Sequence, residues 1–190
     1  MTYAFIRHGQ TDWNRDLLFQ GSSDIPLNDL GRQQAAEAAT ILAGGDWTAI
    51  VSSGLQRARE TARIIAAELG IELGPAYPEL AERDYRSLEG TSTEEALQRW
   101  PDRQYPDAES VVSVVERGRA GLARIAADYP GENVVIVCHG TIIRYTLAAL
   151  AGRPLDAIHN GSISTFRLDG DEWDVLTVNG QPLDSTADRN

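Results

Sequence analysis

The sequence predicts a single α/β domain at residues 1–179: a three-layer α/β/α sandwich with a mainly parallel central sheet and an antiparallel C-terminal strand or hairpin. Apolar, strand-like runs alternate with helix-like segments over most of the length, which is typical of parallel βαβ units. Residues 134–137 are all apolar, as expected of a central strand covered on both faces. Near the C-terminal end, two alternating segments flank Asp169-Gly170-Asp171, which predicts a hairpin.

In the first half of the chain, caps and breakers set the bounds of the predicted elements. Asn28 or Asp29 can cap the first long helix, and Gly44 and Gly45 end it. Gly70 ends the second long helix, whose apolar residues recur at the helical period. The elements are a strand at 3–6, a helix at 30–42, a strand at 49–52, and a helix at 55–69 with a buried stripe of Leu55, Ala58, Ala62, Ile65 and Leu69.

The second half begins with a less regular stretch, residues 74–106, that we expect to cover a pocket and to set its specificity. Ser110 can cap the helix that follows, and residues 180–190 are predicted to be a frayed polar tail. The predicted elements are a short helix at 94–100, a helix at 110–129 with Val111, Val115, Leu122 and Ile125 on one face, strands at 134–137, 162–168 and 173–178, and a helix at 141–150.

Two of the predicted strands end in His-Gly, although the sequence holds only 3 histidines. The first strand runs into Arg7 and His8, and the central strand runs into Cys138 and His139. In parallel sheets, ligands bind beyond the carboxyl ends of the strands. We therefore expect both histidines to face one crevice, where the glycine after each lets the backbone approach a ligand closely.

The charged residues limit what this crevice can bind. The net charge is -11, which disfavours binding to nucleic acid or to an anionic membrane. All 17 basic residues are arginine, so a lysine phosphate loop and a lysine Schiff base are excluded. Arginine grips phosphate in bidentate fashion. Arg7, Arg57, His8 and His139 therefore predict a positive pocket for a phosphoryl group in an acidic protein.

Four segments resemble, in order, the motifs of the histidine phosphatase superfamily, the phosphoglycerate mutase-like branch. They are RHGQTDWN at 7–14, LQRARETA at 55–62, LAERDYRSLEG at 80–90 and VCHGTIIR at 137–144. Each segment alone is a weak signal. The ordered set spans nearly the whole chain and is specific.

The resemblance implies a phosphomonoesterase that needs neither a metal ion nor a cofactor. His8 would be the nucleophile that forms a phosphohistidine, and Glu82 would be the general acid and base. Arg7, Arg57 and His139 would hold the phosphoryl oxygens, since a loose phosphoryl transition state needs position and charge. The substrate site would also include Asn14, Gln20, Gly21 and Gly140.

Three positions depart from the family pattern. Arg86 stands where the family usually has glycine, Leu88 where it usually has tryptophan, and Gly54 where it usually has proline. Arg86 is either solvated or binds an acidic part of the substrate. These departures bear on the choice of substrate more than on the chemistry.

The sequence leaves three other functions open. A mutase would return the phosphoryl group to an alcohol, but no long insertion follows Glu82 to close over a phosphoglycerate. Cys138 and Arg144 match the C-x5-R loop of cysteine phosphatases, although Cys138 is more simply the last residue of a buried strand. A non-catalytic module that binds a phospholigand is the third alternative. Glu89 is a weaker acid candidate, and His159 is expected to be structural or exposed.

The expected partner is a small phosphorylated metabolite: a sugar phosphate, a phosphoglycerate derivative or a nucleoside phosphate. Neither nucleic acid nor a membrane is expected, because no apolar run reaches the length of a membrane span. A single cysteine excludes an internal disulfide, and the chain shows no signal-peptide pattern, so a cytoplasmic location is predicted. The oligomeric state is not predicted.

Overall fold

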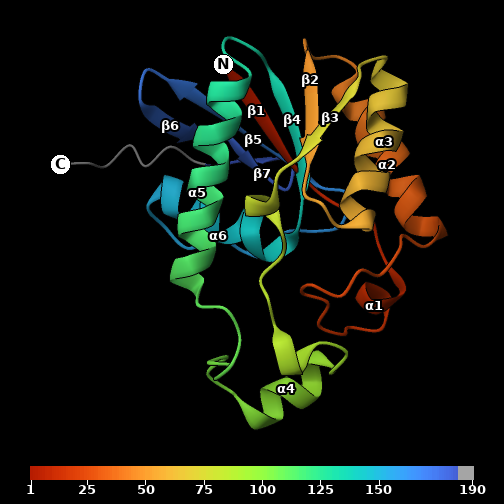
Figure 1. Ribbon diagram of the computed structural model, residues 1–190, viewed down its shortest axis with the longest axis vertical. Coiled ribbons are helices and arrows are strands. Elements are labelled where there is room, and N and C mark those ends of the chain that lie inside the picture. The colour runs from red at the N-terminus through yellow and green to blue at the C-terminus, as the bar shows by residue number, and fades with distance from the viewer. Residues whose placement is uncertain (184–190) are drawn as a thin grey trace.

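A six-stranded sheet forms the centre of the computed structural model, which describes residues 1–183 (Figure 1). The strands lie in the order β3-β2-β4-β1-β5-β6. The first four of these are parallel, whereas β5 and β6 are antiparallel to their neighbours, which confirms the predicted fold class. The strands are β1 (Thr2–Arg7), β2 (Ala49–Ser52), β3 (Leu73–Ala76), β4 (Val134–Cys138), β5 (Ile163–Asp169) and β6 (Glu172–Val175).

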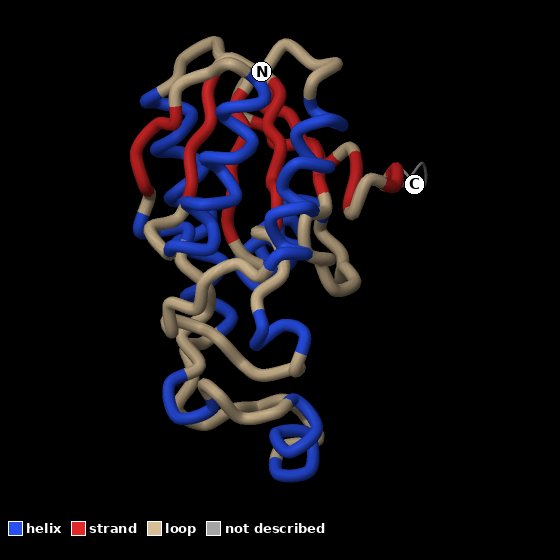
Figure 2. The backbone as a smooth tube through the Cα atoms, turned by 90° about the vertical axis from the view of Figure 1, so that its right-hand side faces the viewer, coloured by secondary structure: helices blue, strands red, loops and turns tan. Residues whose placement is uncertain are grey.

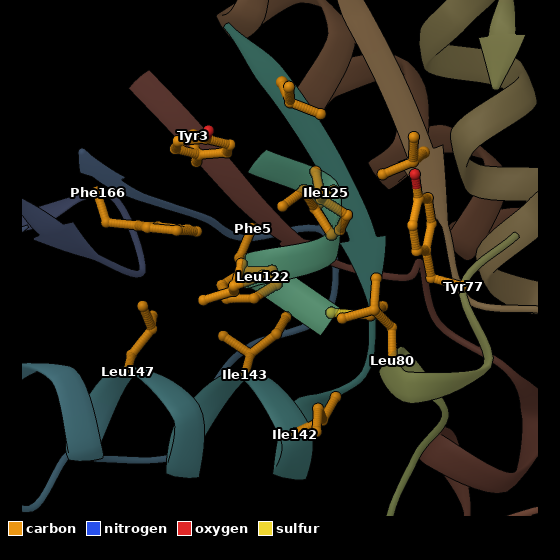
Figure 3. Close-up of a cluster of buried hydrophobic side chains, with 14 of the residues drawn as sticks. Tyr3, Phe5, Tyr77, Leu80, Leu122, Ile125, Ile142, Ile143, Leu147 and Phe166 are labelled. Carbon is orange, nitrogen blue, oxygen red and sulfur yellow. The ribbon is translucent and has the colours of Figure 1, made fainter. Parts of the chain in front are cut away.

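Helices cover both faces of the sheet, because successive side chains of a strand point to opposite faces. Ala4 and Ile6 of β1 pack in the cluster with α2 (Asp29–Leu42) and α3 (Gln56–Leu69). Tyr3 and Phe5 pack in the other cluster, with α5 (Val111–Asp128) and α6 (Gly140–Ala151). Figure 3 shows this second cluster, in which Leu122, Ile125, Ile142, Ile143 and Leu147 point toward the sheet residues.

The predicted caps are present. The side chain of Asn28 accepts a hydrogen bond from the Gly31 N–H at 2.9 Å, and Ser110 accepts one from the Ser113 N–H at 3.0 Å. Gly70 ends α3 with a φ of 67°, a left-handed conformation that suits glycine. These contacts explain why the helix bounds could be placed from the sequence.

A smaller lobe extends from the carboxyl end of the sheet (Figures 1 and 2). It holds α4 (Thr93–Arg99), which matches the expected short helix, and the 3-10 turn Arg86–Leu88. A second 3-10 turn, Pro78–Leu80, and the short helix α1 (Asp12–Arg15) lie nearer the sheet. Neither the 3-10 turns nor α1 was predicted, since three or four residues carry no periodic signal.

Three sequence predictions need correction. In the predicted buried stripe of α3, Leu55 and Leu69 are only partly buried. Residues 74–76, at the start of the stretch that is predicted to be less regular, belong to the edge strand β3. Its Gly74 and Pro75 hide the alternation, and proline is tolerated at a sheet edge. On α5, Val114 is fully buried, whereas Val111 and Val115 are only partly buried. The helix turns this face inward because Gly118 allows close packing: a Cβ there would lie 2.1 Å from Thr146 Oγ1.

The C-terminal residues are ordered further than expected. The strand β7 (Thr177–Val178) pairs with β8 (Gln181–Pro182), and the Leu183 N–H donates to the Leu176 carbonyl at 2.8 Å. The start of the predicted polar tail is therefore paired rather than frayed, and its residues 184–190 lie outside the described structure. The assignment of residues 1–179 to one domain remains a prediction.

Within residues 1–183, no helix is both long and apolar enough to cross a membrane.

Candidate active site

The pairing of β1 with β4 brings the two His-Gly sequences together. Arg7 lies opposite Cys138, and the His8 N–H donates to the Cys138 carbonyl at 3.0 Å. The ring centroids of His8 and His139 are 5.1 Å apart. Both rings lie at the carboxyl end of the sheet, where the sequence predicts a shared crevice.

His8 is 2% exposed, and its two ring nitrogens have different partners. Nδ1 lies 2.7 Å from the Gly9 carbonyl oxygen, and Nε2 lies 3.3 Å from Arg57 Nε. Because a carbonyl only accepts and a guanidinium only donates, Nδ1 carries the hydrogen and Nε2 presents a lone pair. Burial lowers the pKa of His8 well below its usual value, and the charges of Arg57 and Arg7 lower it further. The ring is therefore neutral at neutral pH.

Arg57 is fully buried beside His8 and is held by the loop after α1. Its Nη1 donates to the Ser23 carbonyl at 2.7 Å, and its Nη2 donates to the Gly21 carbonyl at 2.9 Å. Gly21 has a φ of 52°, and a Cβ there would lie 2.1 Å from Glu89 Oε1. Glycine is thus favoured at the position whose carbonyl orients Arg57, because its φ is positive and a side chain would displace the Glu89 carboxylate.

Arg7 and Gly140 are in contact. A Cβ on Gly140 would lie 3.2 Å from Arg7 Nε, so a larger residue would press on the guanidinium. Arg7 Nη1 donates to the Ile158 carbonyl at 2.6 Å. Arg7 Nε is buried and has no hydrogen-bond partner among the described residues, and the same holds for His139 Nδ1.

The side chain of Glu82 lies beside the N-terminus of α6. Its carboxylate accepts hydrogen bonds from the backbone N–H groups of Arg83 at 2.7 Å, Thr141 at 3.1 Å and Ile142 at 3.3 Å. Negative charge is favourable at a helix N-terminus. The charge of Glu82 also acts on both Arg7 and Arg57, where it opposes the lowering of their pKa values by burial. Glu82 is therefore close enough to influence both arginines.

Glu89 contacts the loop after α1 rather than the N-terminus of α6. It accepts hydrogen bonds from the backbone and side chains of Ser22 and Ser23. Partial burial opposes ionisation, but these hydrogen bonds, from Ser23 first, lower its pKa overall. Glu89 therefore orders the loop that carries Gly21.

Asn14 and Gln20 form a polar network behind His8. Asn14 Oδ1 accepts from the Thr11 N–H at 3.1 Å and from Asn160 Nδ2 at 3.1 Å. Gln20 Oε1 accepts from the Thr11 hydroxyl at 2.9 Å. Asn160 Nδ2 also donates to the His8 carbonyl at 3.0 Å. The sequence shows Asn160 only as part of a turn, so its contact with the site was missed.

Ser53 is a second residue that the sequence did not single out. Its hydroxyl oxygen lies 2.6 Å from His139 Nε2, and both residues are fully buried. The only sequence signal was its position directly after a predicted strand.

A cavity of about 1090 Å³ opens beside these residues. Arg7, Glu82 and Gly140 line it, whereas His8, Arg57 and His139 are almost wholly buried and do not. Aromatic rings of Phe19, Tyr85 and Tyr105 line the cavity as well. The centroid of Phe19 lies 4.8 Å from that of Tyr85 and 5.4 Å from that of Tyr105.

The cysteine alternative does not fit this geometry. Cys138 is fully buried within the hydrophobic cluster of the α5–α6 face, and burial raises the pKa of its thiol. A thiolate nucleophile needs the opposite shift. Arg144 lines the cavity and donates from Nε to the Leu155 carbonyl at 2.7 Å. His159 is exposed, as expected.

Among the described residues, no group of three or more His, Cys, Asp or Glu side chains is arranged to hold a metal ion.

Comparison with known proteins identifies the family and agrees with the fold. The sequence model of the histidine phosphatase superfamily (branch 1) matches residues 3–181. The uncharacterized phosphatase PhoE of Bacillus subtilis is 35% identical over 180 residues, 93% of each chain. The phosphoglycerate mutase-like protein 4 of Arabidopsis thaliana is 37% identical over 186 residues, 90% of this chain and 81% of that protein.

A solved structure is also similar. It is that of a mycobacterial glucosyl-3-phosphoglycerate phosphatase in complex with VO3, with a TM-score of 0.85 and 29% identity over 94% of this chain and 98% of that one. Fold, site and relatives together define an enzyme of the phosphoric monoester hydrolase class. The chain belongs to the histidine phosphatase superfamily, as its four motifs predict.

Proposed function

We propose that this protein hydrolyses a small phosphomonoester through a phosphohistidine on His8, without a metal ion. The state of His8 carries the proposal. Its Nδ1–H is tied to the Gly9 carbonyl, which leaves the Nε2 lone pair beside the Arg57 guanidinium. A neutral imidazole is a competent nucleophile near neutral pH, and arginine attracts the phosphate to it.

The reaction has two steps, which covalent catalysis separates. In the first, His8 Nε2 attacks phosphorus and the bond from phosphorus to the alcohol oxygen breaks. Glu82, protonated in the substrate complex in this proposal, gives its proton to that oxygen, because an alkoxide is a poor leaving group. In the second step, water attacks the phosphohistidine, Glu82 takes a proton from the water, and the phosphorus–nitrogen bond breaks. Inorganic phosphate leaves, and His8 and Glu82 return to their starting states.

Two arginines and a histidine take the place of a metal ion in this proposal. Arg7, Arg57 and His139 hold the phosphoryl oxygens and offset their charge in the transition state. The phosphoryl group enters where Arg7 and Gly140 line the cavity. Gly21 supports the phosphoryl site by orienting Arg57, and Asn14 and Gln20 complete the polar wall on the side of α1.

The cavity indicates the class of substrate. Beyond Arg7 and Glu82 its lining is mixed, and it includes both arginines and an aromatic group formed by Phe19, Tyr85 and Tyr105. Aromatic side chains stack on rings and cover apolar surface. We therefore expect a small phosphorylated metabolite whose alcohol portion carries a ring or another apolar surface.

The first experiment is hydrolysis of p-nitrophenyl phosphate in EDTA by wild type, His8→Ala, His159→Ala and Cys138→Ser. We expect His8→Ala to lose activity by ~10³-fold or more, as for other covalent nucleophiles. His159→Ala is the matched control on an exposed histidine, and it should retain activity, as should Cys138→Ser. Acid-labile phosphate should be trapped on the wild-type protein but not on His8→Ala. Full activity of folded His8→Ala would refute the mechanism.

Mutase-type transfer is the second candidate, because one similar relative is named phosphoglycerate mutase-like. In that reaction phospho-His8 returns its phosphoryl group to an alcohol instead of water. Incubation with 3-phosphoglycerate separates the two reactions. Release of inorganic phosphate supports hydrolysis, whereas isomerisation without release supports the mutase.

A further inference from the structure

We propose that Ser53 is a positioning residue of the phosphoryl site: its hydroxyl holds the His139 ring through Nε2, so that Nδ1–H faces a phosphoryl oxygen. The inference rests on the proposed function, because it concerns the same phosphoryl group. It assigns a role to a residue outside the set that the sequence motifs single out.

The sheet places Ser53 beside His139. Ser53 follows directly after β2, and its N–H donates to the Val137 carbonyl at 3.0 Å, so the pairing of β2 with β4 continues to the strand ends. The hydroxyl oxygen then lies 2.6 Å from His139 Nε2. Within the described chain the hydroxyl has no other hydrogen-bond partner. The position of the Ser53 hydroxyl beside His139 is therefore set by the backbone pairing of β2 with β4.

This contact decides which nitrogen of His139 carries the hydrogen. Burial lowers the pKa of His139 well below its usual value, and the charges of Arg57, His8 and Arg7 lower it further, so the ring is neutral before substrate binds. If the Ser53 hydroxyl donates to Nε2, the hydrogen is on Nδ1. The opposite tautomer would leave the hydroxyl hydrogen without an acceptor and would turn a lone pair toward an incoming anion.

The free nitrogens indicate where that anion binds. His139 Nδ1 and Arg7 Nε are both buried without a partner in the described residues, and buried unpaired polar groups are rare. Arg7 Nε is always a donor. The His8 and His139 rings are 5.1 Å apart. A phosphoryl group on His8 would supply the acceptor that these donors lack.

The contact also tolerates a change of charge. A hydroxyl can accept as well as donate a hydrogen bond. If His139 gains a proton beside the phosphoryl group, Nε2–H donates to Ser53 and Nδ1–H still faces the phosphate. Ser53 therefore holds the ring in one orientation through both protonation states.

The test compares Ser53→Ala with Ser52→Ala. Ser52 is equally buried, but its hydroxyl donates to the Ser53 carbonyl at 2.9 Å and not to a histidine. Two readouts are used: the equilibrium affinity for orthovanadate, measured by tryptophan fluorescence, and the tautomer of His139, measured by nitrogen NMR. Loss of one hydrogen bond should weaken vanadate binding and lower kcat by about 10-fold in Ser53→Ala. The NMR signals should show hydrogen shared between both ring nitrogens. Ser52→Ala should match wild type.

Unchanged vanadate affinity and an unchanged His139 tautomer in Ser53→Ala would overturn the inference and leave the role of His8 intact. If wild type binds no vanadate and His8→Ala keeps its turnover, the proposed function fails, and the inference fails with it. Should Ser53→Ala not fold, Ser53→Thr keeps the hydroxyl while Ser53→Cys keeps the volume with a weak donor. Equal vanadate affinity of these two variants would overturn the role of the hydroxyl.

Discussion

His8 and His139 are neutral because they are buried beside arginines. Their positions were predictable, since each follows an apolar strand and precedes a glycine. The partners of their ring nitrogens were not. The rings are contacted by the Gly9 carbonyl, Arg57 and Ser53. These contacts depend on the turn after β1 and on the segment that leads from β2 into α3, so no local sequence pattern predicts them.

The lowered pKa values of the two histidines predict how stability depends on pH. Above the usual histidine value of 6.5 both states of the chain are unprotonated at these residues, so stability is fully present. Below it the unfolded chain binds protons that the folded chain does not. The free energy of unfolding should therefore fall as pH decreases below 6.5, by up to about 1.4 kcal/mol per pH unit for each histidine.

Urea unfolding at about pH 7.5 and about pH 5.5 measures this dependence, in a range above most carboxyl titrations. In His8→Gln the loss of stability between these values should shrink, because one of the two buried groups no longer titrates. His159 is exposed, so His159→Gln should keep the wild-type dependence. The same pH dependence in wild type, His8→Gln and His159→Gln would contradict the assignment of this stability loss to the buried histidines.

Arg86 has a φ of 48°, a left-handed conformation that a non-glycine residue adopts at a cost of roughly 1 kcal/mol. This explains the glycine that the family usually has there. Arg86 is exposed, and its ion pair with Asp84 is 3.5 Å long. It does not line the cavity that contains Arg7, but it lines a second, neighbouring cavity together with Glu82. Arg86→Gly should leave the free energy of unfolding unchanged or raise it by up to about 1 kcal/mol.

Thermal or urea unfolding of Arg86→Gly checks this prediction, with Arg119→Gly as the control. Arg119 lies exposed within α5, where glycine should cost about 1 kcal/mol. A loss of that size in Arg86→Gly, or a changed KM, would mean that the Arg86 side chain has a role that the structure does not show.

At the scale of secondary-structure elements, helix α5 fixes the irregular segment that carries Glu82. Arg117 on α5 donates from Nη1 to the carbonyls of Glu79 at 2.8 Å and Ala81 at 2.5 Å, and from Nη2 to that of Glu82 at 3.1 Å. The same guanidinium forms an ion pair with Glu109 at 2.8 Å, and both side chains are largely buried. One arginine thus fixes an irregular segment to a helix.

Arg117→Met should lower the free energy of unfolding by about 2 kcal/mol or more, because it removes the cationic partner of the Glu109 carboxylate and the Arg117 donors to three carbonyls. It should also lower kcat, since Glu82 loses its support. Urea unfolding and steady-state kinetics measure the two effects. Arg119→Met is the control, because this neighbouring arginine is exposed. Equal kinetics of the two variants would exclude a role of Arg117 in placing Glu82.

The elements that the sequence predicts well are those with their own caps, such as Asn28 for α2 and Ser110 for α5. Those that it misses depend on tertiary contacts. The strand β3 exists because it pairs with β2, although Gly74 and Pro75 disfavour a strand. The inward face of α5 is set by the close approach to α6 at Gly118, which a periodic count of apolar residues cannot detect.

For the molecule as a whole, the alternation of strands and helices was sufficient to predict a layered α/β fold. The strand order β3-β2-β4-β1-β5-β6 was not predictable in the same way, because it depends on which crossovers bring distant strands together. The charge distribution follows from that order. A chain with a net charge of -11 gathers Arg7 and Arg57 at the carboxyl end of its sheet, and the charge of Glu82 acts on both of them.

The position of β1 has a consequence for how the protein is made. This strand leaves the ribosome before the other strands of the sheet, yet its two neighbours in the sheet are β4 and β5, which begin at Val134 and Ile163. Translation at roughly 5–20 residues per second leaves β1 unpaired for several seconds. Contacts this distant in sequence also form slowly. His8, the proposed nucleophile, therefore acquires its surroundings late in synthesis, and an incomplete chain carries His8 without the residues that surround it in the folded protein.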